Sequence, residues 1–272
     1  MSRKVLITGA AGNIGAKLAA HFKGTGQYDL ILVDRVPGDG ITATDLSVYD
    51  AGWAKLFQGV DTVVHLAGNP HGTASWAEVI PANIRATQNV LRAARAAKIR
   101  RVVFASTNQV MLGYRFRDEN PVTTDLPPMP LSPYGVSKLF GEEIGRAFAE
   151  ETGISFIALR IGYFQRGENR PGPHMKIGEW GQSMWLSNAD MNHAVERAIE
   201  AEYVPFAIVN LESDNHGMRW DLAHTRKTIG YEPKEGAPII LEAKNKADDE
   251  AARNLRVKPG TWLDENFTEV NG

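Results

Sequence analysis

Short apolar runs alternate with longer amphipathic stretches through most of the chain. The short runs are continuous rather than alternating, which is typical of parallel strands that are covered on both faces. The longer stretches repeat apolar residues at helical spacing. The expected strands lie at residues 4–8, 29–33, 41–45, 61–66, 101–105, 154–160 and 206–210, and the expected helices at 13–23, 50–58, 76–98, 134–152, 190–201 and 221–229. This alternation predicts parallel βαβ units with right-handed crossovers, and therefore a doubly wound α/β sheet.

The regular pattern loosens near residue 160. Residues 161–188 are rich in glycine and carry few periodic apolar positions, so we expect a long loop over one end of the sheet. Trp180 and Trp185 within this loop favour a packed lid. Because no repeat or clean linker divides the chain, we expect a single body. In it, residues 1–160 form the core with its catalytic helix, and residues 161–272 form the lid and a small C-terminal substrate lobe.

The composition narrows the functional classes. The 272 residues are 43% hydrophobic and 23% charged, and the net charge of -2 provides no basic surface for nucleic acid. The absence of cysteine excludes disulfides and thiolate catalysis. The first apolar run is too short for a signal peptide and no stretch approaches a membrane span, so we expect a cytoplasmic protein with no membrane contact. The seven histidines lack the spacing of a metal site, and no metal is expected.

The first expected strand runs into a glycine-rich turn, TGAAGNIG. Gly9, Gly12 and Gly15 allow a tight turn, bring backbone N–H groups close to a pyrophosphate, and let the next helix pack against the sheet. The second strand ends in Asp34, nineteen residues after Gly15. Its carboxylate can accept both hydroxyls of an adenosine ribose and would repel a 2′-phosphate. Together these residues predict a Rossmann-type site for NAD, while the neighbouring Arg35 leaves NADP open.

A tyrosine and a lysine lie one helical turn apart in the stretch SPYGVSK. Tyr134 and Lys138 therefore share one helix face. The strand at 101–105 leads into Ser106 and Thr107 at the carboxyl edge of the sheet, where such sheets bind ligands. A phenol has an ordinary pKa of about 10, and a nearby ammonium and an oxidised nicotinamide would both favour its phenolate. The three groups suit proton abstraction from an alcohol, with either hydroxyl able to take part.

These motifs together resemble the short-chain dehydrogenase/reductase family in its extended branch, which includes NAD-dependent epimerases and dehydratases. The likeness covers nearly the whole chain and also includes HLAG at 65–68, NIRAT at 83–87 and FAST at 104–107. It implies catalysis by Thr107, Tyr134 and Lys138, and it selects Thr107 over Ser106. With the glycine turn, it implies cofactor contacts from Gly9, Gly12, Asn13, Ile14, Gly15, Asp34, Arg35, Asp45, Leu46, Leu66, Ala67, Gly68, Asn83, Tyr134, Lys138 and Ile161.

Within that branch the chain is most similar to uronate dehydrogenases, which oxidise C1 of a cyclic sugar acid to a lactone with NAD. FASTNQ resembles their FASSNH, and RIG at 160–162 and WLS at 185–187 are also similar. Two positions depart from their pattern, because Gln109 replaces a substrate-binding histidine and Trp180 falls where they have an arginine for the substrate carboxylate. The residues expected to bind substrate are His71, Ser106, Asn108, Gln109, Tyr163, Arg166 and Arg170.

The resemblance implies an NAD-dependent dehydrogenase that oxidises a cyclic sugar or sugar acid at C1. The expected substrate is a hexose with an anionic C6 group, such as a uronate, a 6-sulfo sugar or a 6-phospho sugar, and a neutral aldose stays open. An epimerase or dehydratase that retains NAD is the alternative, because the same three residues serve both reactions. A nucleotide sensor is disfavoured since both the tyrosine and the lysine are present. A homo-oligomer is expected.

Overall fold

The computed structural model describes residues 2–254, and these form one parallel sheet with helices on both faces. Its seven strands follow the order β3-β2-β1-β4-β5-β6-β7, and each neighbouring pair is parallel. The order runs outward from β1 in both directions, which confirms the predicted doubly wound α/β sheet. The strands are β1 (Arg3–Thr8), β2 (Tyr28–Asp34), β3 (Ile41–Ala43), β4 (Thr62–His65), β5 (Arg101–Thr107), β6 (Ser155–Ile161) and β7 (Phe206–Leu211).

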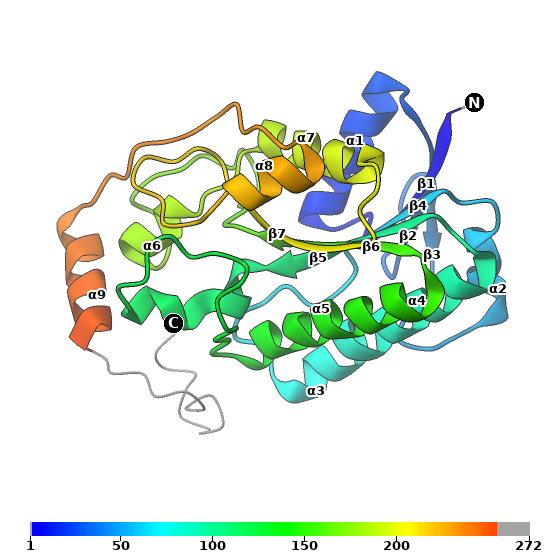
Figure 1. The fold of residues 1–272 in the computed structure, drawn as a ribbon, viewed down its shortest axis with the longest axis horizontal. Helices are drawn as coiled ribbons and strands as arrows, with labels where there is room; N and C mark the ends of the chain where they lie inside the picture. The colour runs from blue at the N-terminus through cyan, green and yellow to red at the C-terminus, as the bar shows by residue number, and fades with distance from the viewer. Residues whose placement is uncertain (1, 255–272) are drawn as a thin grey trace.

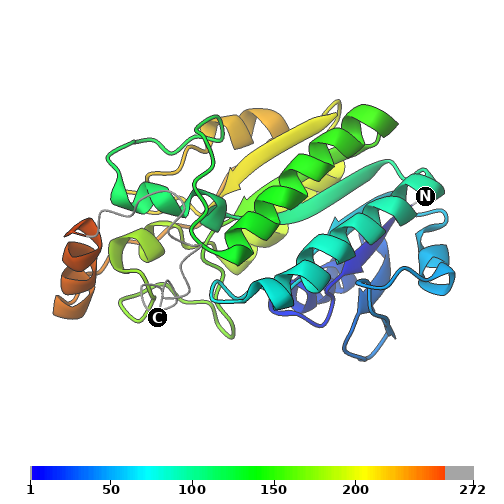
Figure 2. The same ribbon diagram turned by 90° about the horizontal axis from the view of Figure 1, so that it is seen from below.

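Two helical layers enclose the sheet (Figure 1). One face carries α1 (Asn13–Thr25), α7 (Asn188–Glu200) and α8 (Ala223–Ile229). The other carries α3 (Trp76–Val79), α4 (Ala86–Ala97) and α5 (Pro133–Thr152), and Figure 2 shows α4 and α5 lying along the strands. The remaining helical segments are α2 (Ala51–Ala54), η1 (Lys55–Phe57), η2 (Ile80–Arg85), η3 (Asn108–Phe116), α6 (Gly178–Ser183) and α9 (Ala243–Asn254). Each face therefore buries its own apolar core, as continuous apolar strands require.

The helix expected over residues 76–98 is divided into three parts. α3 ends at Val79, the segment η2 is π-helical, and α4 begins at Ala86. Pro81 lies at the start of η2. Because proline lacks an N–H and its ring crowds the carbonyl four residues earlier, α-helical hydrogen bonding cannot continue regularly through it.

The helix α5, which carries the Tyr-x-x-x-Lys pair, lies unusually close to the sheet. A Cβ on Gly141 would lie 2.2 Å from Cζ of Phe104, and one on Gly145 would lie 2.2 Å from Cε1 of Phe156. Both glycines therefore allow the helix backbone to rest directly on β5 and β6. The helix begins where the Ser132 hydroxyl accepts a hydrogen bond from a first-turn N–H, with a proline at its first position. The start of α5 is thereby fixed beside the carboxyl end of β5.

The chain after residue 160 adds β7 to the same sheet and then covers its carboxyl end. A third buried apolar cluster lies there, and it includes Trp180 and Trp220, whose rings meet edge to face at 5.1 Å. Trp180 and Trp185 are both buried. The helices α6 and α9 lie beyond this end of the sheet in both views (Figures 1 and 2). Within residues 2–254 no helix has the length and apolarity to cross a membrane.

Candidate active site

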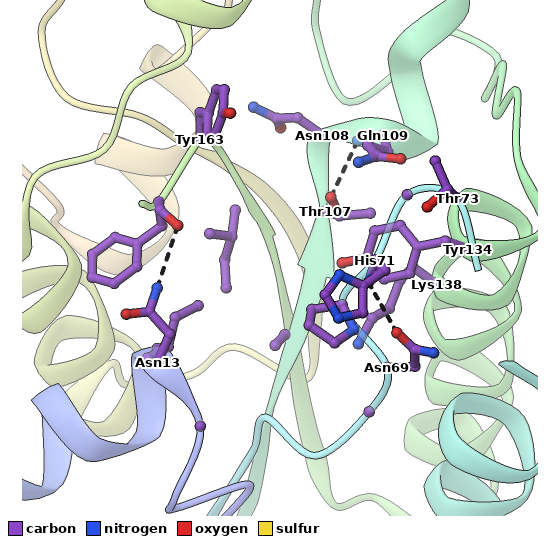
Figure 3. Close-up of a pocket in the computed structure, with 18 of the residues that line it drawn as sticks. Asn13, Asn69, His71, Thr73, Thr107, Asn108, Gln109, Tyr134, Lys138 and Tyr163 are labelled. Atoms are coloured by element: carbon purple, nitrogen blue, oxygen red, sulfur yellow. Dashed lines mark hydrogen bonds between the residues drawn. The ribbon is translucent and has the colours of Figure 1, made fainter. Parts of the chain in front are cut away.

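One large pocket runs along the carboxyl ends of the strands (Figure 3). Its volume of about 2250 Å³ exceeds the roughly 300–1,000 Å³ of a pocket for one drug-sized ligand. It therefore has room for a dinucleotide and a second small molecule. The turn after β1 and the end of β2 form one half of the lining, and the end of β5, the start of α5 and the loop after β6 form the other.

The glycine turn shapes the first half of the pocket. Gly9 has a φ of +74°, and a Cβ there would lie 2.7 Å from the Ala67 nitrogen. A Cβ on Gly15 would lie 2.1 Å from the Gly9 carbonyl oxygen, so neither position tolerates a side chain. Gly12 caps α1 without any side-chain hydrogen bond, which leaves the first N–H groups of the helix facing the pocket. A helix N-terminus of this kind fits the pyrophosphate of a dinucleotide.

The second element of this half is the acid at the end of β2. The Asp34 carboxylate accepts backbone hydrogen bonds from Ala11 and Val36, both at 2.9 Å, and is thereby held at the pocket wall. Arg35 also lines the pocket. Hydrogen bonds from Ser47 lower the pKa of Asp45, and the nearby Arg35 contributes further. The arginine therefore faces a second carboxylate, which partly compensates its charge.

The structure brings nearly all predicted cofactor residues to this pocket. Asn83 is the exception, because its amide does not line the cavity. Its Oδ1 accepts from the Asn69 nitrogen at 2.7 Å, and its Nδ2 donates to the Ser137 hydroxyl at 2.8 Å. Asn83 therefore holds the loop after β4 against α5 and supports the pocket from behind.

The predicted reacting groups meet at the centre of the pocket (Figure 3). The side chains of Tyr134 and Thr107 lie near each other, and the Thr107 hydroxyl acts to lower the pKa of Tyr134. Thr107 Oγ1 accepts a hydrogen bond from the Gln109 nitrogen at 3.3 Å. Lys138 lies one turn further along α5, with Nζ 5.1 Å from the centre of the Phe104 ring. Donor, acceptor and cation thus come from two adjoining elements, β5 and α5.

Burial dominates the proton equilibria of this pair. It raises the pKa of Tyr134 to about 12, against which the Thr107 hydrogen bond acts in the lowering direction. It also lowers the pKa of Lys138 to about 8. In the protein without cofactor, burial is therefore the largest effect on the pKa of both groups. A positive charge brought to the pocket would act in the opposite direction on Tyr134.

Ser106 and Thr107 are separated by the alternation of side chains along β5. The Ser106 hydroxyl donates to Glu142 at 2.5 Å, and Ser106 also contributes to the pocket lining. Glu142 receives two further hydrogen bonds from Arg160, at 2.9 and 2.8 Å, and all three side chains are buried. The Ser106 hydroxyl is therefore already engaged in the contact between α5 and the sheet. This placement favours Thr107 as the catalytic hydroxyl.

The predicted substrate residues divide into two groups. His71, Asn108, Gln109 and Tyr163 line the pocket around the reacting centre (Figure 3). Ser106 and Arg166 also belong to the lining. Arg170 does not. Its side chain is 78% exposed and lies 2.8 Å from Glu168, so the prediction that it contacts substrate does not agree with its position.

Several lining residues were not found from the sequence. Arg115 of η3 reaches the pocket wall and lies 3.5 Å from Asp249 of α9. The helix α9 also contributes Lys244 and Asp248 to the lining. Neither segment carries a motif, and α9 is too polar to show an apolar face. The one feature of the sequence that could have indicated this part of the pocket is Arg115, which is the single charged residue in the stretch 110–116.

The doubly wound sheet and its glycine turn define a dinucleotide-binding α/β protein. Residues 5–174 match the NAD dependent epimerase/dehydratase family, and the chain belongs to it. The predicted family membership is confirmed. The cofactor is NAD, as predicted, and the chain is an NAD-dependent oxidoreductase.

Full-length relatives and structures agree with this assignment. L-arabinose 1-dehydrogenase (NAD(P)(+)) of Haloferax volcanii is 34% identical over 255 residues, covering 88% of this chain and 99% of that protein. NAD-dependent glucose-6-phosphate dehydrogenase of the same organism is 33% identical over 258 residues, covering 87% and 95%. The structure of a mutated uronate dehydrogenase superimposes with a TM-score of 0.75 at 28% identity, covering 100% of this chain and 91% of that one. All three are similar to this chain across its core and its lid.

Proposed function

We propose that this enzyme oxidises the C1 hydroxyl of a cyclic sugar to the lactone, with a preference for a hexose that carries an anionic C6 group. The observation that carries the proposal is that Thr107 and Tyr134 line the same pocket as the glycine turn and Asp34. A hydroxyl and a phenol that lie beside each other can both contact a single alcohol oxygen. The similarity to three sugar dehydrogenases supports a sugar as that alcohol.

The chain's own residues would divide the reaction between them. Thr107 would donate a hydrogen bond to the C1 oxygen and hold it beside the phenol. Tyr134, as the phenolate, would accept the proton of that hydroxyl as the C1–O bond becomes a carbonyl. Bound NAD supplies the acceptor for the hydride that leaves C1. Lys138 would hold the nicotinamide ribose and, while protonated, favour the phenolate.

Part of the pocket lining is basic. Arg166, His174 and Lys176 come from the loop after β6, and Arg115 and Lys244 come from η3 and α9, together with the acidic Glu242 and Asp248. Charge-assisted contacts from arginine bind carboxylate, sulfonate or phosphate groups strongly and often in a bidentate manner. A sugar anchored there by an anionic C6 group would place C1 toward the reacting pair. This supports a uronate first, and a 6-sulfo or 6-phospho sugar next.

A panel of uronates, hexose 6-phosphates, 6-sulfo hexoses and neutral aldoses, scored by NADH absorbance, tests the proposal. We expect NADH formation with at least one anionic hexose and a higher kcat/KM than for any neutral aldose. An epimerase or dehydratase that retains its NAD would convert sugar without accumulating NADH. Faster turnover of a neutral aldose than of every anionic sugar would show that the basic lining is a solvated surface.

Arg166→Ala is expected to lower kcat/KM for the preferred anionic sugar by about 10- to 100-fold, the loss of one hydrogen bond between charged groups. The same variant should change little toward a neutral aldose, which never used the contact. Arg170→Ala is the matched control, because its guanidinium already pairs with Glu168 outside the pocket. Equal losses in the two variants, or equal losses for anionic and neutral sugars, would remove Arg166 from the binding site.

Asp34→Ala is expected to reduce the preference for NAD over NADP by raising KM for NAD and lowering KM for NADP. The change removes a ribose contact and a negative charge that opposes a 2′-phosphate. Steady-state kinetics with both cofactors measure it, and Asp45→Asn serves as a control for a change of charge nearby. A wild-type enzyme that uses both cofactors equally well would mean that Arg35 overrides the acid.

A further inference from the structure

A buried carboxyl group lies directly behind the pocket wall at the end of β7. Glu212 follows the last residue of β7, and its side chain is fully buried. The Asn108 amide Nδ2 donates a hydrogen bond to its Oε1. Gly162 packs beside the acid, since a Cβ there would lie 2.2 Å from the Met184 carbonyl oxygen and 3.3 Å from Cγ of Glu212. Asn108 itself lines the pocket, one residue after Thr107.

Each member of this pair has one oxygen without a partner. Glu212 Oε2 and Asn108 Oδ1 are both buried, and neither has a hydrogen-bond partner among residues 2–254. No Lys, Arg or His within that part of the chain forms an ion pair with Glu212. If Glu212 were an ionised carboxylate, it would be buried without a cation, and both Glu212 Oε2 and Asn108 Oδ1 would remain acceptors without a donor. One proton on Oε2 supplies the hydrogen that both oxygens lack.

We propose that Glu212 is a positioning residue, held as the neutral acid, which forms a two-point pair with Asn108 and fixes its carboxamide in the wall of the sugar site. In this pair Glu212 Oε2–H donates to Asn108 Oδ1, and Asn108 Nδ2 donates to Glu212 Oε1. Burial raises the pKa of Glu212 well above its ordinary value, while the Asn108 hydrogen bond acts the other way. The acid is therefore neutral where an exposed glutamate would be ionised.

The pair has a consequence for recognition. An isolated asparagine can turn its amide over and present either an oxygen or an N–H to a ligand. Locked against Glu212, Asn108 keeps its oxygen toward the acid, and the second N–H of its Nδ2, which lies 4.0 Å from the weak acceptor Met184 Sδ, remains a donor. The wall beside Thr107 then selects an acceptor on the sugar. This inference rests on the proposed oxidation of a sugar in the same pocket.

Four variants test it, assayed with the sugar that the wild type oxidises best. Glu212→Gln preserves both hydrogen bonds, since its amide can donate to Asn108 Oδ1, and should keep kcat/KM within about threefold. Glu212→Met removes both hydrogen bonds at similar volume and should lower kcat/KM for the sugar by about 10-fold or more. The affinity for NAD should stay near that of the wild type in both. Asn108→Ala should show a similar loss, and Asn108→Ala/Glu212→Met should lose no more than Asn108→Ala alone.

An infrared difference spectrum between wild type and Glu212→Gln reads the protonation state without any sugar. We expect the carbonyl stretch of a protonated carboxylic acid in the wild type at neutral pH and its loss in the variant. This measurement reports the protonation state of Glu212 even if Glu212→Met does not fold or no sugar is oxidised. Its outcome therefore does not depend on whether the proposed function is correct. Absence of that band, a Gln variant as impaired as the Met variant, or additive losses in the double variant would each overturn the proposal.

Discussion

Replacing Tyr134 by phenylalanine is expected to lower kcat by about 10²- to 10⁴-fold, the contribution of a positioned general base, and in practice to abolish turnover. The change removes one oxygen, so the fold and the affinity for NAD should be nearly unchanged. The rest of the centre stays in place, because Thr107 still caps η3 by accepting from the Gln109 nitrogen. NADH absorbance gives kcat, and titration of NAD into the variant gives the binding constant.

The pH dependence provides an internal check on this role. Burial raises the pKa of Tyr134 to about 12 without cofactor, so the phenol is the predominant form at neutral pH. Since the phenolate is the form that accepts the proton, wild-type kcat/KM should rise with pH as its fraction grows. That rise should be absent from the residual activity of Tyr134→Phe. A variant with near-normal kcat would falsify the phenolate mechanism, and a wild-type rate independent of pH would assign the proton to another group.

The fold was predictable because its signal is local. Each strand is a continuous apolar run and each main helix an amphipathic one, and their alternation leaves few topologies open. The predicted elements differ from the observed ones where a single residue or a tertiary contact determines the local structure. Pro81 converts part of a regular helix into a π-helical segment, and the short helix at Gly178–Ser183 appears inside an expected loop. The helix at Ala243–Asn254 is polar and lacks the apolar face by which a helix is predicted from sequence.

In the site, too, features set by local sequence were predictable and features set by tertiary contacts were not. The glycine turn, Asp34 and the Tyr134–Lys138 pair follow from spacing along one strand or one helix, and the structure places them in a single pocket. The direction of an individual side chain does not follow from spacing. Arg170 points into solvent, where it pairs with Glu168. Glu212 carries no motif at all, and its contact with Asn108 joins residues 104 positions apart.

Thr107→Ala is expected to lower kcat/KM by about 10²- to 10³-fold, which corresponds to roughly 2.7–4 kcal/mol of transition-state stabilisation from one preorganised hydrogen bond. Thr107→Ser is the matched control, because it keeps the hydroxyl and removes only a methyl group. It should retain most of the activity. The loss in the alanine variant should appear in kcat as well as in kcat/KM, since the hydrogen bond is made to the oxygen that changes during the reaction.

Ser106→Ala tests whether the hydroxyl next to Thr107 contributes to catalysis or only to the stability of the fold. Its hydroxyl donates to Glu142 at 2.5 Å, and Glu142 remains paired with Arg160 when the hydroxyl is removed. The lost hydrogen bond to a charged group should therefore lower the free energy of unfolding by about 1.5–3 kcal/mol and leave kcat within a few-fold of the wild type. Thermal unfolding and steady-state kinetics on the same preparations measure both. If Ser106→Ala loses more kcat than Thr107→Ala, the catalytic hydroxyl belongs to Ser106, which also lines the pocket.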